Sequence, residues 1–142
     1  YGEAIPLRLP RGLPLAMTNL FFMIQNYSQT IKQHYHFPLN IGKLAHFNFS
    51  TEHLNPLCGD ETKVFIRVEN GTIKDIAHET RGCMICVAAA SVVSEYVKGK
   101  ILSEIKKLGA HDIAKLLNVS ISPARQECAL LLLRAIERLQ AN

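Results

Sequence analysis

TKVFIRVENGTIKDIAHET, residues 62–80, decides the fold. Every second residue from Val64 to Val68 is apolar, which is typical of a strand with one buried face. Asn70-Gly71 is the strongest short signal for a two-residue hairpin turn, and a second strand-like run follows it. The stretch therefore predicts an antiparallel sheet, with helices elsewhere in the chain.

Helices are predicted on both sides of this hairpin from apolar spacing, capping residues and helix-ending glycines. They cover residues 20–36, 84–98, 102–108, 111–117 and a final stretch that opens at Ser122-Pro123. Residues 40–49 predict a loop that leads into an edge strand. The sequence thus predicts an α+β fold, in which helices pack on a small three-stranded antiparallel sheet.

The composition suits one domain with a real core, since the chain has 142 residues and 48% of them are apolar. No apolar run is long enough to cross a bilayer, so we expect no membrane association. Sixteen Lys and Arg against twelve Asp and Glu give a net charge of +4. These charges are spread out, which argues against nucleic-acid binding and fits an acidic protein partner better.

The N-terminal stretch contrasts with this domain. Pro6, Pro10 and Pro14 forbid a regular helix over residues 1–16, so we expect a loose tail there and a single domain over residues 17–142.

Four cysteines are too few for a disulfide framework in a chain of this length, and no secretory signal is visible. Reduced thiols and a cytoplasmic location are therefore expected.

The hairpin also predicts where two cysteines meet. Its register, continued past the strand ends, puts Asp60 opposite Arg81 and Cys58 opposite Cys83. Directly opposed residues have Cβ atoms roughly 5 Å apart. Proline and glycine near Cys58 can break the ladder, so the prediction is proximity at the open end of the hairpin, with the aspartate between the thiols.

Cys83 precedes a helix, and a helix N-terminus favours the thiolate that binds metals. Cys128 lies on the buried stripe of the last helix, which can bring it to the same end of the sheet. With Cys58 and Asp60 these residues make three thiolates and one carboxylate. That donor set suits tetrahedral zinc, or iron in a sulfur-rich site.

Plainer interpretations of these cysteines remain. A cysteine on an apolar stripe is usually a core residue, which applies to Cys128. Cys83 and Cys86 form a C-x-x-C that would suit a redox pair at a helix start, but no βαβ context surrounds it. A small apolar role inside a buried helix suits Cys86 better.

Four stretches together resemble the IscU/SufU/NifU-type iron–sulfur cluster scaffold family, over residues 27–139. They are HYHFPLNIGKL at residues 34–44, NPLCGDE at 55–61, RGCMICVAAASVVSEYVKGK at 81–100 and SPARQECALLLLRAIERL at 122–139. Their order and spacing make the resemblance specific. It implies a three-stranded antiparallel sheet with helices packed on it.

The resemblance implies that Cys58, Asp60, Cys83 and Cys128 hold a transient [2Fe–2S] cluster, or Zn²⁺ at the same site. Cys128 and Cys58 are the candidate sulfur acceptors. Sulfur would come as persulfide from a cysteine desulfurase that depends on pyridoxal phosphate, and the cluster would pass to acceptor apoproteins. Such a protein is a scaffold rather than an enzyme; if active, it transfers sulfur stoichiometrically.

Departures from the family pattern leave the subtype open. Glu127 stands where the Isc type has a histidine, and residues 121–125 read ISPAR in place of a chaperone-recognition segment. Arg125 fits the SufU type, in which it would lie near the metal beside Glu127. However, the gap between Cys83 and Cys128 is too short for the SufU insertion, and Cys86 replaces a usual serine or alanine.

Two other functions are therefore weighed against the scaffold. One is a zinc-dependent sulfur acceptor of the SufU type, in which a cysteine leaves zinc to take the persulfide. The other is a binding module with a purely structural zinc, whose buried ligands would be inert.

Overall fold

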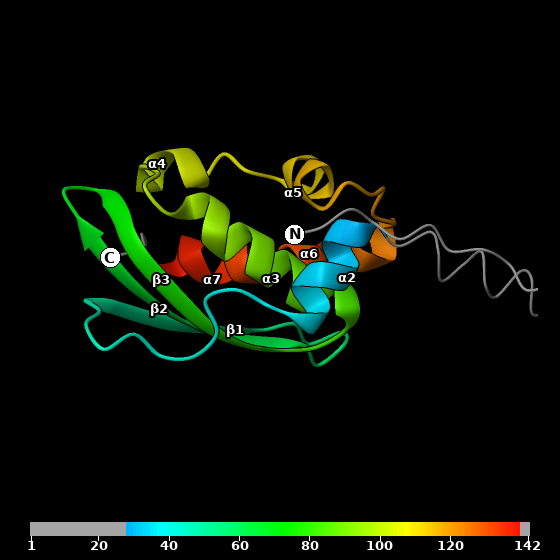
Figure 1. The fold of residues 1–142 in the computed structure, drawn as a ribbon, viewed down its shortest axis with the longest axis horizontal. Coiled ribbons are helices and arrows are strands. Elements are labelled where there is room, and N and C mark those ends of the chain that lie inside the picture. The colour runs from blue at the N-terminus through cyan, green and yellow to red at the C-terminus, as the bar shows by residue number, and fades with distance from the viewer. Residues whose placement is uncertain (1–27, 140–142) are drawn as a thin grey trace, which may run out of the picture.

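The computed structural model describes residues 28–139 and has the predicted α+β architecture: a three-stranded antiparallel sheet with helices on one face (Figure 1). The strands are β1 (Phe49–Leu54), β2 (Glu61–Glu69) and β3 (Thr72–Arg81), in the order β1-β2-β3. Asn70 and Gly71 both have positive φ, as a two-residue hairpin turn requires. The predicted tail and the start of the first predicted helix lie outside the described residues.

Seven helical segments accompany the sheet in the described range. They are α2 (Gln29–His36), α3 (Met84–Val97), α4 (Leu102–Ile105), α5 (Ala110–Leu117), η1 (Pro123–Arg125), α6 (Gln126–Ala129) and α7 (Leu131–Arg138). α3 packs on β3, α7 packs on β1 and β2, and α2 packs against α3. No helix within residues 28–139 is both long and apolar enough to span a membrane.

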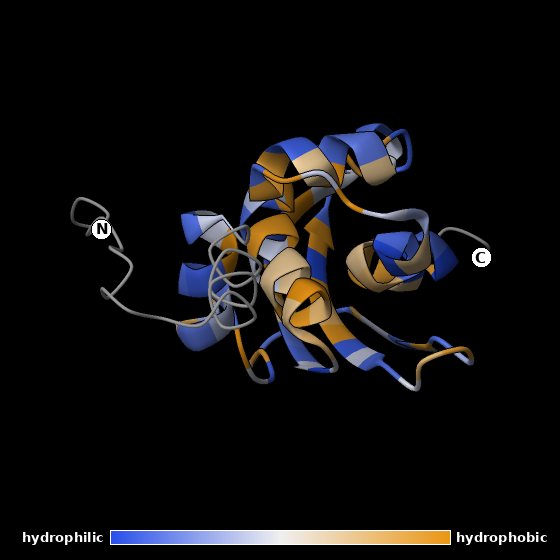
Figure 2. Cartoon of the chain, turned by 90° about the vertical axis from the view of Figure 1, so that its right-hand side faces the viewer, coloured by the Kyte–Doolittle hydropathy of each residue, from blue (hydrophilic) through white to orange (hydrophobic). Residues whose placement is uncertain are grey.

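The core lies between α3, the sheet and α7. Buried apolar residues of these elements form one cluster. Figure 2 colours the hydrophobic positions along the ribbon orange. Ten of the fourteen residues of α3 are buried, because helices and the sheet enclose it on most sides. This agrees with the buried helix predicted over residues 84–98, and Gly99, with φ of +80°, follows it.

One part of the predicted strand register is wrong. A β-bulge between Arg67 and Val68 shifts the pairing of β2 with β3 by one residue. Glu61, and not Asp60, therefore faces Arg81. The ladder begins only at Glu61, so Cys58 and Cys83 lie beyond it and are not paired. The prediction for these two cysteines was proximity at this end of the sheet, not pairing.

The structure shows how α2 begins and how the last predicted helix is divided. Ser28 has an extended backbone (ψ 156°), and its hydroxyl accepts a hydrogen bond from the Ile31 N–H, so α2 begins directly after it. Residues 20–27 of the helix predicted over residues 20–36 lie outside the described residues. The last predicted helix is η1, α6 and α7 in succession, and Leu130 (φ −89°, ψ 0°) separates the last two. Hydrogen bonds to Gln126 O and from Arg134 N keep Leu130 aligned with both segments.

Candidate metal centre

The loop between β1 and β2 carries Cys58 and is closed by its own backbone. The Asn55 N–H donates to Asp60 O at 2.8 Å, and the Gly59 N–H donates to Asn55 O at 2.8 Å. The buried Asn55 side chain also accepts from the Leu57 N–H at 3.0 Å. Gly59 has φ of +77°, which a residue with a side chain rarely adopts. The loop therefore presents an exposed Cys58 at a defined position.

Three potential metal-binding side chains meet at this end of the sheet. One ligand atom from each of Cys58, Asp60 and Cys128 lies within 4.8 Å of the others. The Sγ atoms of Cys58 and Cys128 are 3.8 Å apart. Two sulfurs that each lie about 2.3 Å from one tetrahedral metal are separated by about 3.8 Å, so this spacing suits a shared metal ion.

Asp60 offers the clearest sign that a cation belongs here. The residue is only 7% exposed, and its Oδ2 has no hydrogen-bond partner. A buried carboxylate oxygen without a partner is unfavourable unless a cation or a donor reaches it. A Cβ atom on Gly82 would lie 2.6 Å from Asp60 Cγ, so glycine at this position leaves room for the carboxylate.

Cys83 lies at the same end but is not part of the three-residue group. It is the N-cap of α3, and its Sγ accepts from the Cys86 N–H at 3.5 Å. Its partly buried side chain packs against a small core cluster of Cys86, Cys128 and Leu131. The structure therefore places Cys83, the fourth predicted ligand, beside Cys128. It does not bring all four ligand atoms together around one metal position.

The surroundings of the two buried thiols, Cys128 and Cys86, disfavour their deprotonated form. Burial, a hydrogen bond with Asp60 and the nearby Cys83 together raise the pKa of the Cys128 thiol. Burial, then the Asp60 charge and the other thiols, raise the pKa of Cys86 in the same direction. A divalent cation would reverse this effect, because it favours the deprotonated form of every donor around it.

The two residues predicted to lie behind the ligands have their own surroundings. Glu127 is exposed and forms an ion pair with Arg134 at 3.2 Å, and Arg134 also pairs with Glu137 at 3.3 Å. Arg125 lies in η1 and is exposed. Their assignment as residues that support the metal ligands stays a prediction.

Sequence reasoning missed a buried polar chain that starts next to the centre. His78 is fully buried. Its Nε2 donates to Leu39 O at 3.0 Å, since a carbonyl can only accept. Its Nδ1 therefore accepts from Thr80 Oγ1 at 2.7 Å, and Thr80 in turn accepts from Thr62 at 2.7 Å. The sequence signal for this chain was a polar residue on a buried strand face: Thr62 shares that face with Val64 and is two residues from Asp60.

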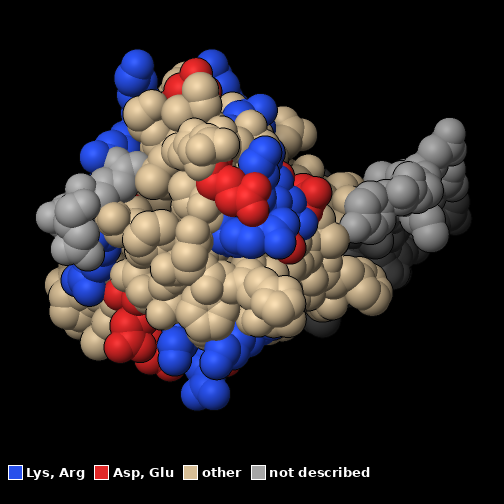
Figure 3. All heavy atoms as spheres, turned by 90° about the vertical axis from the view of Figure 1, so that its left-hand side faces the viewer, with Lys and Arg blue, Asp and Glu red and all other residues tan. Residues whose placement is uncertain are grey.

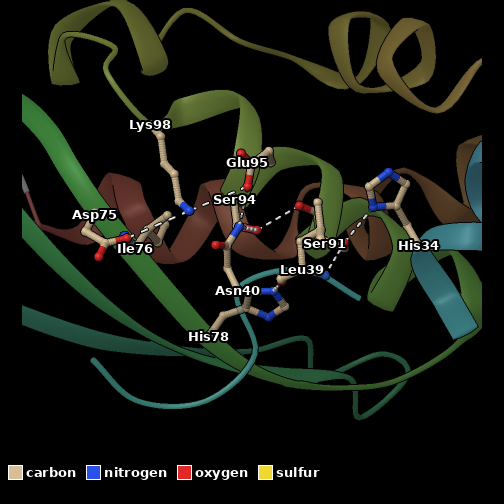
Figure 4. Close-up of polar contacts among 10 residues, drawn as sticks. All are labelled: His34, Leu39, Asn40, Asp75, Ile76, His78, Ser91, Ser94, Glu95 and Lys98. Carbon is tan, nitrogen blue, oxygen red and sulfur yellow. Dashed lines mark hydrogen bonds and ion pairs between the residues drawn. The ribbon is translucent and has the colours of Figure 1, made fainter. Parts of the chain in front are cut away.

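The segment that His78 binds is also held by α3, as Figure 4 shows. Ser91 Oγ accepts from the Leu39 N–H at 2.8 Å and contacts His34 Nδ1 at 2.6 Å. Asn40 donates to Ser94 Oγ at 3.0 Å. These contacts fix the segment between α2 and β1 against both α3 and β3.

Surface charge does not form a field of one sign on the face drawn in Figure 3. Basic and acidic side chains are interleaved there. Lys98 forms ion pairs with both Asp75 and Glu95. This agrees with the spread of charge along the sequence.

The fold and the site define a small α+β protein with a sulfur-rich candidate metal centre at one end of its sheet. The family model described as "NifU-like N terminal domain" matches residues 26–141. The chain therefore belongs to the NifU-like N-terminal domain family.

Known relatives resemble this chain in sequence, and solved structures resemble it in fold. The chain is 35% identical to "Iron sulfur cluster assembly protein 1" of Trachipleistophora hominis, over 84% of this chain and 87% of that protein. It is 35% identical to the "Iron-sulfur cluster assembly scaffold protein IscU" of Escherichia coli K12, over 78% and 88%. A SUF-system scaffold structure described as putative, from Fervidobacterium islandicum, superposes with a TM-score of 0.69 at 25% identity, over 80% and 96% of the two chains.

A NifU-like structure from Brucella abortus superposes with a TM-score of 0.68 at 22% identity. It covers 82% of this chain and 92% of that one, and it supports the fold alone.

Proposed function

We propose that this protein is a scaffold on which an iron–sulfur cluster is assembled and from which the cluster is passed to acceptor apoproteins. Membership of the NifU-like family and similarity to proteins named for iron–sulfur cluster assembly support this role. The observation that carries the proposal is the meeting of Cys58, Asp60 and Cys128 within 4.8 Å.

The cargo is a [2Fe–2S] cluster held by Cys58, Asp60, Cys83 and Cys128. Thiolates are the preferred donors for iron in such clusters, whereas a carboxylate is a harder and weaker ligand. Asp60 would therefore complete the site and also keep the cluster labile enough to leave. Cys83 joins the set from the start of α3, where it already packs beside Cys128.

Sulfur would reach the site from a cysteine desulfurase that depends on pyridoxal phosphate. Cys58 is the exposed thiol of the group and Cys128 is 4% exposed. An incoming persulfide would therefore meet Cys58 first, and Cys128 lies 3.8 Å behind it as the second acceptor. The protein would act stoichiometrically here, as a carrier of sulfur rather than as an enzyme.

A zinc-dependent sulfur acceptor is the second candidate. Its support is the similarity to the Fervidobacterium SUF-system structure, together with Glu127 in place of a histidine. In this case zinc would occupy the same donor set, and one cysteine would leave it to accept the persulfide.

The cellular location stays a prediction. We expect the cytoplasm, but a relative from Yarrowia lipolytica that is 36% identical carries "mitochondrial" in its name.

Anaerobic reconstitution tests the proposal. The reduced protein is incubated with ferrous iron, cysteine and a cysteine desulfurase, and visible absorption, iron and acid-labile sulfide are measured. The scaffold predicts a brown protein with about two irons and two sulfides per chain. A colourless protein that keeps one zinc and carries persulfide would support the sulfur acceptor instead. A protein that takes up neither cluster nor persulfide would contradict both.

A further inference from the structure

Cys86 is a fourth thiol beside the candidate centre with no part in the proposed donor set. It is completely buried in the first turn of α3, in a cluster with Cys128 and Leu131 against which Cys83 packs. A small apolar residue would fill such a position without reactivity. Burial alone would suit such an apolar role, so any chemical role for Cys86 depends on its position relative to Cys83.

The backbone places Cys83 and Cys86 three residues apart at the start of α3, a spacing found in redox-active C-x-x-C pairs. Strand β3 ends at Arg81, one residue intervenes, and Cys83 then caps α3. Cys86 follows three residues later, and its N–H points at Cys83 Sγ at 3.5 Å. Residues three apart at the start of a helix lie on one side of it, so their thiols need only a local side-chain movement to join.

The two thiols also differ in access. Cys83 is partly exposed, whereas Cys86 is fully buried directly behind it. An external reagent can therefore reach Cys83, whereas Cys86 has no exposed surface of its own. This is the order that an attacking thiol and a resolving thiol need.

We propose that Cys83 and Cys86 are a redox dithiol that reduces a small-molecule disulfide and closes into an intramolecular disulfide. The redox step does not depend on the proposed function. Its consequence does, because the closed form withdraws Cys83 from the donor set and leaves two thiolates in place of three.

The reaction is a double thiol–disulfide exchange. Cys83 sulfur attacks one sulfur of oxidised glutathione, a Cys83–glutathione bond forms, and one glutathione thiolate leaves. Cys86 sulfur then attacks the Cys83 sulfur, the Cys83–Cys86 bond forms, and the second glutathione thiolate leaves. The two protons lost by the protein thiols go to the two glutathione molecules, so the protein loses two electrons and one oxidised glutathione gains them.

The competing pair is Cys58 and Cys128, whose sulfurs are 3.8 Å apart. That pair joins a loop to a separate helix, and its sulfurs would have to close to about 2.05 Å. The Cys128 thiol would also give up its interaction with Asp60. Cys83 and Cys86 are in one helical turn, so no two segments of the chain must approach each other.

Peptide mapping separates the two pairs. The metal-free, reduced full-length chain is treated with oxidised glutathione, the remaining thiols are alkylated, and the protein is digested with trypsin. Cleavage after Lys and Arg places Cys83 and Cys86 together in the peptide of residues 82–98. Cys58 falls in residues 44–63 and Cys128 in residues 126–134, so their disulfide would link two peptides.

We expect the 82–98 peptide to lose two hydrogen atoms, while Cys58 and Cys128 are recovered alkylated. The same closed peptide should form in Cys58→Ser, in which the competing pair is impossible. In Cys86→Ser, or in Cys86→Ala should the serine variant not fold, glutathione should stay attached to Cys83. Because no iron or zinc is present, a failure of the scaffold proposal would leave this result unchanged.

Two outcomes would overturn the redox proposal. One is a linked pair of the 44–63 and 126–134 peptides in the parent protein, with two alkylated thiols in residues 82–98. The other is a glutathione adduct on Cys83 that persists in the parent protein as it does in Cys86→Ser.

Discussion

Two polar clusters of the protein, one around His78 and one at the candidate centre, differ in how their hydrogen bonds are satisfied. Around His78, both ring nitrogens have partners, and Ser91 and Asn40 secure the same segment (Figure 4). At the candidate centre, Asp60 Oδ2 has no partner and the buried thiol of Cys128 is crowded by other acidic groups.

This difference separates a structural role from a functional one. A satisfied buried network stabilises the fold and gains nothing from a ligand. An unsatisfied anionic cluster is unfavourable in isolation and becomes favourable when a cation binds. Substitutions around His78 should therefore lower stability. Substitutions at the candidate centre should change how much iron–sulfur cluster the protein takes up.

The largest expected effect is on cluster loading. Cys58→Ser and Cys128→Ser each remove a soft sulfur donor, so reconstituted iron and sulfide should fall more than about tenfold, because hydroxyl oxygen is a poor ligand for these irons. Lys107→Gln, an exposed substitution remote in sequence from both, should load normally. Normal loading of Cys58→Ser would exclude this thiol from the site.

The next effect is on stability. His78→Ala leaves a cavity, removes one of the two hydrogen-bond partners of Thr80 and leaves Leu39 O without its His78 donor, so the free energy of unfolding should fall by about 3 kcal/mol. Urea denaturation of the metal-free protein measures this. His111→Ala, at an exposed position, should change stability by less than about 0.5 kcal/mol. Equal stability of the two variants would show that the His78 network is not structural.

Asp60→Ala should affect the lifetime of the bound cluster rather than the stability of the fold. Asp60 interacts with the Cys128 thiol but leaves its buried Oδ2 without a hydrogen-bond partner, so removing the carboxylate should cost the metal-free protein little stability. The cluster should survive chelator several-fold longer, because the weakest ligand no longer promotes release. The chelator half-life of the reconstituted cluster is the measurement, with Asp75→Ala on β3 as the matched control. A shorter half-life in Asp60→Ala would contradict this role.

The smallest effect is on the pH dependence of stability. Burial lowers the pKa of His78 below its ordinary value of 6.5, although the hydrogen bond to Leu39 offsets part of the shift. The folded protein therefore holds His78 neutral while the unfolded chain takes up a proton as pH falls. The stability contributed by neutral His78 is present above pH 6.5 and is lost as pH falls toward the lowered pKa, by up to about 1.4 kcal/mol per pH unit.

His34 and His53 add to this loss, since burial lowers the pKa of both. Denaturation at several pH values below neutrality should give a smaller slope for His78→Gln than for the parent protein. An unchanged slope would assign the acid sensitivity to the other histidines.

Much of the fold follows from local sequence signals. The Asn70-Gly71 turn, the apolar alternation of β2 and the all-apolar start of α3 each predicted an element that the structure contains. The bulge beside Arg67 was not predictable, because its sequence alternates like a regular strand. It changed which residue faces Arg81, since one extra residue shifts the whole register beyond it.

The candidate site was predicted in part. Proximity of Cys58 to Asp60 follows from their spacing, whereas their approach to Cys128 depends on how α6 packs, which the sequence suggested only through its apolar stripe. The chain from Thr62 to His78 is a tertiary feature, because it requires the cross-strand register and the return of Leu39 to β3. Polar residues on a buried strand face were the available signal for it.

The central claim is that three thiolates and the Asp60 carboxylate hold the cluster. The most direct test is low-temperature Mössbauer spectroscopy of protein reconstituted with iron-57, compared with Asp60→Cys. We predict two inequivalent ferric sites in the parent protein, one with only sulfur ligands and one with an oxygen ligand, and a single kind of site in Asp60→Cys. Identical spectra for the two proteins would contradict the assignment of Asp60 as the fourth ligand.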